Sequence, residues 1–269
     1  MSAWLQLRGA LVRATGGESK SMLRVGLPAM PRPWWPWYYV CVLACRWYFR
    51  LGAQLEVIGL ENLPKDGGWM FASNHISSAD PAILTGILLP HWVRYMAKVE
   101  LFQKPGMGEL FALSGTFPVR RFDRDLGALR EAEDLLAAGR IVGMFPEGHR
   151  SDTGAMIEAH PGTALIALRS NAPVVPVAIT GSEAFRKGPF SALNQPKMRV
   201  VFGQPFQFHH EGRTRRADVE AASERIMREI AARLPARYRG VYLERFRDLP
   251  ATATIDPPAQ GSTSESRAQ

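Results

Sequence analysis

The sequence is poor in cysteine and in long apolar runs. Only two of the 269 residues are cysteine, which excludes a disulfide scaffold and makes a reducing compartment the expected setting. Cys41 and Cys45 lie four residues apart, so they would share one helix face, and we expect them to pack rather than to bind a metal. The uncharged run 33–45 would rise about 20 Å as a helix, short of the roughly 30 Å hydrocarbon core of a bilayer. A membrane-spanning helix is therefore not expected.

Several motifs are also absent, and their absence removes whole classes of function. There is no Gly-x-Ser-x-Gly elbow, no His-Glu-x-x-His pair and no phosphate-binding P-loop, so the common serine-hydrolase, zinc-protease and nucleotide-hydrolase sites are not expected. There is no zinc-ligand spacing, RNA-recognition signature or helix-turn-helix signal, so no nucleic-acid partner is expected.

Basic residues are abundant, and most of them are arginine. The chain holds 33 lysines and arginines against 25 acids, a formal net charge of +8, and only 6 of the basic residues are lysine. This balance favours an anionic partner such as a membrane surface or a phosphorylated substrate.

The two ends of the chain differ from its middle. Residues 1–50 carry seven basic residues against one acid, and they include a run rich in tryptophan and tyrosine. Such rings prefer the headgroup level of a bilayer, and flanking arginines favour anionic lipid. We expect a membrane-associating segment, with an aromatic helix that caps the domain core as the alternative. Residues 249–269 lack apolar periodicity and are expected to form a disordered tail.

Apolar strand-like runs alternate with helical stretches between these ends. The expected strands are Gln54–Gly59, Trp69–Ser73, Val93–Ala97, Thr116–Arg120, Ile141–Phe145, Val174–Ile179 and Met198–Phe202. The expected helices are Pro81–Leu89, Gly106–Leu113, Leu126–Ala138, Pro161–Ser170 and Ala217–Leu234. Many of these strands are apolar at consecutive positions, which is typical of a sheet covered by helices on both faces. The alternation favours an α/β fold.

A histidine and an aspartate lie five residues apart after the second expected strand. Histidine can act as a general base near neutral pH, and a carboxylate on its second ring nitrogen would fix the tautomer and stabilise the imidazolium. Residues five apart on one helix point about 140° apart, so His75 and Asp80 can meet only across a turn. A strand that ends at Ser73 and a helix that begins at Asp80-Pro81 would provide that turn. The alternative is that Asp80 only caps its helix.

A second polar segment, 146–151, follows the expected strand Ile141–Phe145. It would place the carboxylate of Glu147 and the guanidinium of Arg150 at the edge of the sheet, where ligands of α/β proteins bind. Arginine offers a planar fork for phosphate oxygens, and Gly148 would let a polar ligand approach the backbone. The alternative is a polar turn with an exposed salt bridge.

Two further segments, around Arg120 and around Pro176, each allow more than one interpretation. Arg120 and Arg121 lie at the end of the expected strand Thr116–Arg120, where they would contact a phosphate or form a solvated surface run. Pro176 interrupts an apolar run, which predicts a bulge or an edge strand, and the alternative is a plain core strand.

Taken in order, these four segments resemble the motif blocks of the glycerolipid acyltransferases. The segments are Asn74-His75-x4-Asp80, Gly115…Arg121, Phe145-Pro146-Glu147-Gly148-x-Arg150-Ser151 and Val175-Pro176-Val177. The resemblance covers residues 50–205 and is closest to the bacterial 1-acylglycerol-3-phosphate acyltransferase branch. It implies a mixed, mostly parallel sheet flanked by helices, with residues 51–248 as the acyltransferase domain after the 1–50 segment.

The resemblance also implies roles for the site residues. His75 would take the proton from a glycerol hydroxyl of the acceptor, with Asp80 orienting the ring, and the alkoxide would attack an acyl thioester with no covalent acyl-enzyme. Six other residues would bind the substrates: Asn74, Arg121, Glu147, Gly148, Arg150 and Ser151. The two arginines would hold the acceptor's phosphate, and the Glu-Gly pair would bind around its glycerol portion.

The implied reaction moves an acyl chain from acyl-CoA or acyl-carrier protein to lysophosphatidic acid and gives phosphatidic acid, with no metal and no further cofactor. The expected location is the cytoplasmic face of the cell membrane, peripheral or monotopic, with anionic lipid bound through residues 1–50. Two departures concern the headgroup: His149 stands where threonine is common, and His160 stands where a lysine is expected. The alternatives are an acyltransferase for another lyso-lipid acceptor and a non-catalytic, basic membrane-binding protein.

Overall fold

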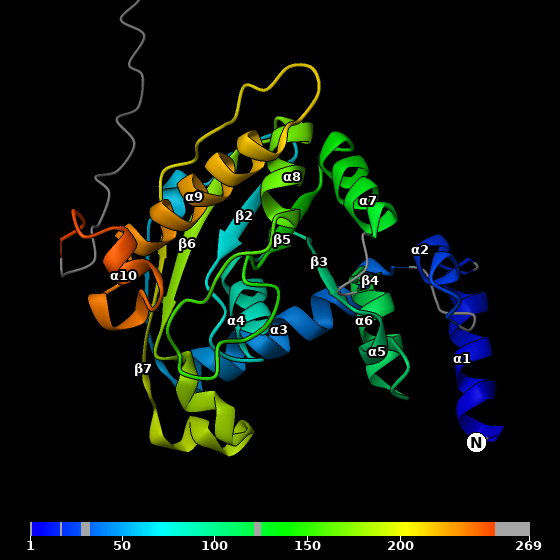
Figure 1. The fold of residues 1–269 in the computed structure, drawn as a ribbon. Helices are drawn as coiled ribbons and strands as arrows, with labels where there is room; N and C mark the ends of the chain where they lie inside the picture. The colour runs from blue at the N-terminus through cyan, green and yellow to red at the C-terminus, as the bar shows by residue number, and fades with distance from the viewer. Residues whose placement is uncertain (1, 17, 28–32, 121–124, 251–269) are drawn as a thin grey trace, which may run out of the picture.

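The computed structural model describes residues 2–16, 18–27, 33–120 and 125–250. A seven-stranded sheet in the order β1-β7-β6-β2-β5-β3-β4 runs through it (Figure 1). The strands are β1 (Gln54–Ile58), β2 (Trp69–Ser73), β3 (Val93–Lys98), β4 (Phe117–Val119), β5 (Ile141–Met144), β6 (Val174–Thr180) and β7 (Lys197–Phe202). Neighbouring strands are parallel except β6 and β7. The predicted α/β fold with a mixed, mostly parallel sheet is confirmed, and each expected strand is present.

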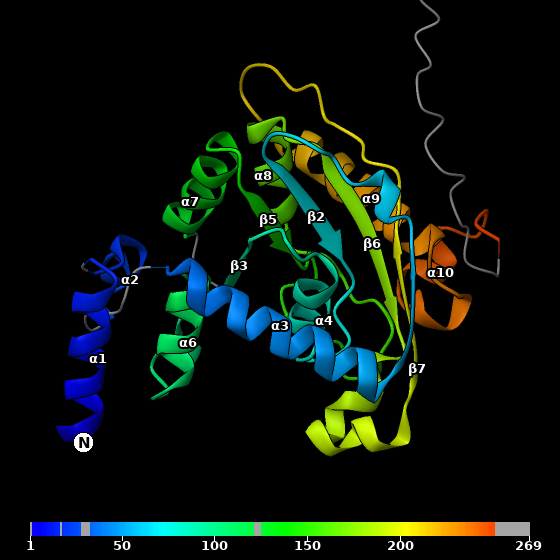
Figure 2. The same ribbon diagram turned by 180° about the vertical axis from the view of Figure 1, so that it is seen from behind.

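Helices cover both faces of the sheet. One face carries α3 (Trp35–Gly52) and α4 (Asp80–Ile87), and the other carries α7 (Leu126–Ala137), α8 (Gly162–Ser170) and α9 (Arg216–Ala232), as Figures 1 and 2 show. Successive residues of β2 enter different cores: Met70 packs beneath α7–α9, and Phe71 packs beneath α3 and α4. Burial on both faces explains why the strands are apolar at consecutive positions.

Shorter helices complete the structure. They are α1 (Ser2–Ala14), α2 (Lys20–Arg24), α5 (Val99–Phe102), α6 (Met107–Ser114), α10 (Tyr242–Arg245) and the 3-10 helices η1 (Leu60–Asn62), η2 (Ser182–Lys187), η3 (Pro189–Asn194) and η4 (Ala236–Tyr238). Of the expected tail, 251–269 lies outside the described residues.

The aromatic run near the N-terminus forms most of α3, whose two faces differ in their surroundings. Tyr38, Val42 and Phe49 are buried, and α3 packs on α4. Most of the other face is apolar and exposed, with exposed fractions of 57% for Trp47 and 70% for Leu51. The core-capping alternative is therefore correct for one face. Among the described residues, no helix is long and apolar enough to cross a membrane.

Pro176 lies in β6, between β7 and β2, so the expectation of an edge strand is wrong. β6 is instead a central core strand, as the alternative expected, and it pairs with β2 without a break from Val174 to Val177. A bulge lies in the neighbouring segment after β7. Val177 pairs with Phe202, and the next pairing on that side joins Val174 to Phe206, which leaves one extra residue opposite Pro176. A backbone N–H of the bulge, that of Gly203, donates to the Pro176 carbonyl at 2.8 Å.

Candidate active site

The carboxyl ends of β2, β5 and β6 meet at one edge of the sheet, and the predicted site residues follow them. β2 leads into the loop that carries His75, and β5 leads into the loop that carries Glu147. Asn74 fastens the first loop to β6, because its amide donates to the Ile179 carbonyl at 2.9 Å and accepts the Ile179 N–H at 2.8 Å. This is the edge at which parallel α/β sheets bind ligands.

His75 and Asp80 meet across a turn, as the spacing predicted. His75 Nδ1 lies 2.9 Å from Asp80 Oδ2. The same oxygen accepts the backbone N–H groups of Ile76 and Ser77, each at 2.7 Å. Asp80 is fully buried, whereas the His75 side chain is 13% exposed. A buried carboxylate held by three donors is a rigid partner for the imidazole.

The expectation that Asp80 caps its helix is wrong. A capping side chain accepts an N–H from two or three residues further along the helix, whereas the Asp80 carboxylate turns back toward the loop before it. The N-cap residue of α4 is Ala79, and no side chain caps the helix. The aspartate is thus committed to the turn and to the imidazole.

An aromatic ring stacked on the imidazole also restrains its position. The rings of His75 and Phe145 stack with centroids 4.2 Å apart and planes inclined by 24°. With Nδ1 donating to Asp80, the neutral ring carries its lone pair on Nε2. Among the described residues Nε2 has no hydrogen-bond partner. The ring is therefore fixed in position with one basic nitrogen unoccupied.

Glu147 is fully buried, and its carboxylate bonds the protein backbone. Its Oε1 accepts the His75 N–H at 2.8 Å, and its Oε2 accepts the Ile157 N–H at 3.0 Å. Burial raises the pKa of Glu147 to about 7, although these two hydrogen bonds oppose the shift. The carboxylate is thus placed to hold the histidine loop rather than to face solvent.

Replacing Glu147 with glutamine is expected to remove a pH dependence of stability. The folded-state pKa of about 7 exceeds the ordinary value of 4.5. Between these values the folded protein binds a proton that the unfolded chain lacks, so this contribution to stability is lost as pH rises toward 7. Urea unfolding of wild type and variant from pH 5 to 8 should give a difference that changes by up to about 1.4 kcal/mol per pH unit below pH 7. A pH-independent difference would contradict the assignment.

The remaining residues of this loop form the rim of the site. Arg150 and His149 are exposed, and no ion pair or hydrogen bond of Arg150 is found among the described residues. Gly148 has a φ of +70°, and a Cβ there would lie 2.6 Å from a ring carbon of His160. Glycine is therefore required both by the backbone and by the neighbouring ring.

The other predicted substrate-binding residues differ in placement. Asn74 and Ser151 are buried, and their polar groups are bonded within the protein. The backbone N–H of Ser151 donates to the His75 carbonyl at 3.0 Å, so the two loops are joined directly. Arg121 lies outside the described residues.

Arg186 of η2 is a site residue that the sequence did not reveal. Its Nε donates to the Ile76 carbonyl at 2.9 Å, and its Nη1 donates to the Asp152 carbonyl at 2.6 Å. Its Nη2 donates to the Ser151 carbonyl. One guanidinium thus fastens the histidine loop to the Glu147 loop. All three acceptors are backbone carbonyls, so no side-chain motif marks the contact.

Comparison with known proteins agrees with this arrangement. A family model described as acyltransferase matches residues 54–180. The 1-acyl-sn-glycerol-3-phosphate acyltransferase of Bacillus subtilis (strain 168) is 33% identical over 198 residues, which are 70% of this chain and 94% of the relative. The chloroplastic 1-acyl-sn-glycerol-3-phosphate acyltransferase BAT2 of Brassica napus is 31% identical over 156 residues, which are 56% of this chain and 45% of the relative.

A solved structure has the same fold. The crystal structure of the 1-acyl-sn-glycerophosphate (LPA) acyltransferase PlsC from Thermotoga maritima matches with a TM-score of 0.53 and 23% identity, over 71% of this chain and 78% of that one. At this identity the match supports the architecture of the sheet and its helices. The family model and the extent of the Bacillus match lead to one conclusion: this chain belongs to the acyltransferase family.

Proposed function

We propose that this acyltransferase transfers an acyl chain from a thioester donor to the free hydroxyl of 1-acyl-glycerol-3-phosphate and so makes phosphatidic acid, a step of phospholipid biosynthesis. The observation that carries the proposal is the histidine ring fixed by Asp80, with Nε2 unoccupied at the ligand-binding edge of the sheet. The acceptor is the substrate that the names of the Bacillus and Brassica relatives give for those proteins. The donor is acyl-CoA or acyl-carrier protein.

The reaction needs one proton relay. His75 Nε2 removes the proton of the acceptor hydroxyl as its oxygen attacks the thioester carbonyl, and the buried Asp80 carboxylate stabilises the imidazolium that forms. This attack forms the C–O bond of the new ester. The tetrahedral intermediate then collapses with cleavage of the C–S bond, and the imidazolium gives its proton to the departing sulfur. No covalent acyl-enzyme is required, because the acceptor oxygen is itself the nucleophile.

Several residues serve this chemistry by holding the loops. Glu147, Asn74 and Arg186 bond backbone groups of the segment 74–76. We assign them positioning roles, which for Glu147 and Asn74 replaces direct substrate contact. Gly148 leaves room at the rim. Arg150 is exposed there and is available to an incoming phosphate. Arg121 is retained in the proposal as a second phosphate contact.

The test is an assay of the purified protein with acyl-CoA and acyl-carrier protein as donors and a panel of lyso-acceptors, with products identified by mass. We expect 1-acyl-glycerol-3-phosphate to be the preferred acceptor. Replacing Arg150 with alanine should raise the KM of that acceptor about ten- to a hundredfold and leave the donor KM unchanged, since a charge-assisted hydrogen bond contributes about 1.5–3 kcal/mol.

The matched control is the replacement of Arg216 by alanine, because that side chain is 92% exposed and pairs with Glu220 on α9. It should leave both KM values unchanged. A preference for another lyso-lipid would reassign the acceptor. If Arg150→Ala raised only the donor KM, the arginine would belong to the donor's phosphates, and absence of any transfer would contradict the proposal.

We further propose that the exposed face of α3 rests on the membrane that contains the acceptor. The face consists of Val40, Leu43, Trp47 and Leu51, spaced three or four residues apart so that they form one stripe. η3 packs against the C-terminal end of α3, where a Cβ on Gly52 would lie 2.5 Å from the Ala192 side chain. Its residues Phe190 and Leu193 are each 81% exposed.

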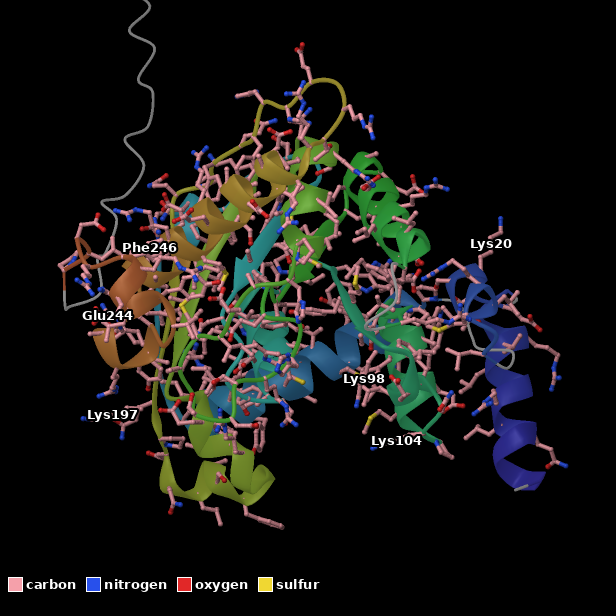
Figure 3. The ribbon with its side chains drawn as sticks, in the orientation of Figure 1. Lys20, Lys98, Lys104, Lys197, Glu244 and Phe246 are labelled. Atoms are coloured by element: carbon pink, nitrogen blue, oxygen red, sulfur yellow. The ribbon has the colours of Figure 1, made fainter. Side chains whose placement is uncertain are left out.

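Basic side chains accompany this surface. Arg50 of α3 is exposed, and so is Lys197 (labelled in Figure 3), which follows η3 in the chain and pairs in the sheet with Gln54, just after α3. Exposed rings beside arginine and lysine are typical of surfaces that enter the headgroup layer of anionic membranes. This surface extends the N-terminal segment 1–50 with residues from a distant part of the chain.

A further inference from the structure

A hollow lies at the opposite end of the strands from His75. It has a volume of about 690 Å³ and is formed where β3 and β5 begin. Its walls include Trp35 and Tyr39 of α3, His91 and Trp92 before β3, and the two cations Arg94 and Arg140. The four residues of β5 separate it from the Glu147 loop, about 13 Å at 3.3 Å per residue. We call it the basic hollow.

Arg94 is buried, and the described part of the chain gives it no anionic partner. Its exposed fraction is 9%, and its Nε and Nη1 atoms, both inaccessible to solvent, have no hydrogen-bond partner among those residues. The guanidinium carbon lies 3.8 Å from the centre of the Trp92 ring. Burial lowers the pKa of Arg94 to about 10, and the like charge of Arg140 adds to the shift. A buried guanidinium in this state is costly unless an anion joins it.

The carbonyl groups just before Gly115, the residue that packs against the Arg94 guanidinium, each accept a hydrogen bond from another group. At the end of α6, the carbonyls of residues 111–114 accept hydrogen bonds from the backbone N–H groups of Thr116, Gly115 and Trp34 and from the Trp92 indole. The backbone therefore does not satisfy the guanidinium. The fold nevertheless makes room for it, since a Cβ on Gly115 would lie 1.4 Å from Arg94 Nη1. The glycine at position 115 is thus required by the position of the Arg94 guanidinium, so the surrounding structure accommodates the cation specifically.

The walls of the hollow are fastened to the first turns of α3. The Tyr39 hydroxyl donates to the Pro90 carbonyl at 2.7 Å, and the Tyr38 hydroxyl donates to the His91 carbonyl and accepts the Val93 N–H, each at 2.9 Å. Trp35, at the mouth, is 61% exposed. The hollow is therefore held against the helix whose outer face is exposed and apolar.

We propose that the basic hollow binds the phosphate of an anionic phospholipid headgroup, with Arg94 and Arg140 supplying the positive charge and Trp35 and Trp92 the walls. Two guanidinium groups, one of them unpaired, match a phosphate in charge and in hydrogen-bonding capacity. The choice of lipid over free phosphate rests on the proposed membrane placement of α3, whereas the requirement for an anion rests on Arg94 alone. This site is distinct from the acceptor phosphate site assigned to Arg150.

The test compares wild type with Arg94→Leu and with the control Arg247→Leu, which removes an equal charge from a side chain that is 77% exposed and pairs with Glu244. The probes are soluble dihexanoyl-phosphatidylglycerol, zwitterionic dihexanoyl-phosphatidylcholine and inorganic phosphate. Binding is followed by calorimetry and by tryptophan fluorescence, to which Trp35 and Trp92 contribute. Because the active site also receives lipids, the readout is the difference between wild type and Arg94→Leu.

We expect Arg94→Leu to weaken phosphatidylglycerol binding at least tenfold, Arg247→Leu to leave it unchanged, and phosphatidylcholine and inorganic phosphate to bind weakly to all three proteins. Without ligand, Arg94→Leu should unfold at the same or a higher temperature than wild type, because it removes an uncompensated buried charge. Its turnover with a soluble short-chain acceptor should stay within twofold of wild type.

Three results would overturn the proposal. Equal phosphatidylglycerol affinity in wild type and Arg94→Leu would remove the site. Arg94-dependent binding of inorganic phosphate as tight as that of the lipid would make it a site for free phosphate. A tenfold rise in the acceptor KM of Arg94→Leu would make the hollow part of the acceptor site. If Arg94→Leu does not fold, Arg140→Gln decides in its place, since Arg140 is exposed at the rim and its loss should weaken phosphatidylglycerol binding several-fold.

Discussion

Replacing His75 with alanine is expected to lower the rate of acyl transfer by about 10² to 10⁴ and to leave the protein folded. The imidazole supplies the unoccupied Nε2, and among the described residues no other histidine has Nδ1 fixed by a carboxylate. The fold should survive, because His75 lies in a loop and the backbone bonds to Glu147 and Ser151 do not involve its side chain. The measurement is steady-state transfer to 1-acyl-glycerol-3-phosphate, with circular dichroism and thermal unfolding on the same samples.

Two companion variants sharpen this result. Asp80→Asn should cost less than His75→Ala, because an amide oxygen can still accept the His75, Ile76 and Ser77 donors while the negative charge beside the imidazolium is lost. His209→Ala is the matched control, since His209 is an exposed histidine outside the site, and it should leave turnover unchanged. A folded His75→Ala protein with wild-type turnover would rule out the histidine as general base.

Much of the architecture could be predicted because apolar runs and their boundaries are local properties of the chain. Each of the seven strands begins and ends within one residue of its expected position, and α4, α6, α7, α8 and α9 lie within two residues of theirs. The order of the strands could not be read in this way. In the sheet β1 and β7 lie side by side at one edge, and Gln54 pairs with Lys197 although the two residues are far apart in the chain.

The short helices, and which side chains of α3 are buried, could not be predicted from the sequence for a different reason. α2 and α10 contain only 5 and 4 residues, too few to show a helical period, and their packing against other elements stabilises them. In α3 the aromatic residues lie all around the helix, so composition could not distinguish the buried Tyr38 and Phe49 from the exposed Trp47. Tertiary contacts alone decide which rings are covered.

The site shows the same division between local and distant information. The meeting of His75 and Asp80 follows from a strand end, a turn and a helix start within eight residues, and it was predicted. The inward direction of Glu147 was not, because residue type places a carboxylate near a strand end without saying whether it faces the ligand or the neighbouring loop. Its partners, the N–H groups of His75 and Ile157, are backbone groups without a sequence signature.

Removing the exposed apolar side chains of α3 and η3 is expected to lower binding to anionic vesicles at least a hundredfold. The variant replaces Trp47, Leu51, Phe190 and Leu193 with serine. Full burial of such a side chain contributes about 1.5–3 kcal/mol, and partial insertion of four of them exceeds the roughly 2.7 kcal/mol that a hundredfold change requires. The measurement is sedimentation with vesicles that contain phosphatidylglycerol.

Point replacement tests this surface better than deletion of residues 1–50. Phe49 belongs to the core beneath the sheet, and the Tyr38 hydroxyl bonds the backbone at the start of β3. Deletion would therefore open the core and confuse loss of binding with loss of folding. The four replaced side chains are 57–81% exposed, so their loss should leave the unfolding temperature nearly unchanged. The control is the double replacement with serine of two exposed apolar residues outside α3 and η3: Val241, the N-cap residue of α10, and Leu243 within α10.

Activity should separate binding from chemistry in this variant. Transfer to an acceptor embedded in vesicles should fall with vesicle binding, while transfer to a short-chain acceptor free in solution should stay near the wild-type rate, because His75 and Asp80 are untouched. High salt should release the wild type only partly, since screening weakens the contribution of the arginines and lysines but not that of the rings. Wild-type vesicle binding by the fourfold variant would exclude this surface, and complete release of the wild type by salt would mean that the contact is electrostatic and that the exposed rings do not enter the bilayer.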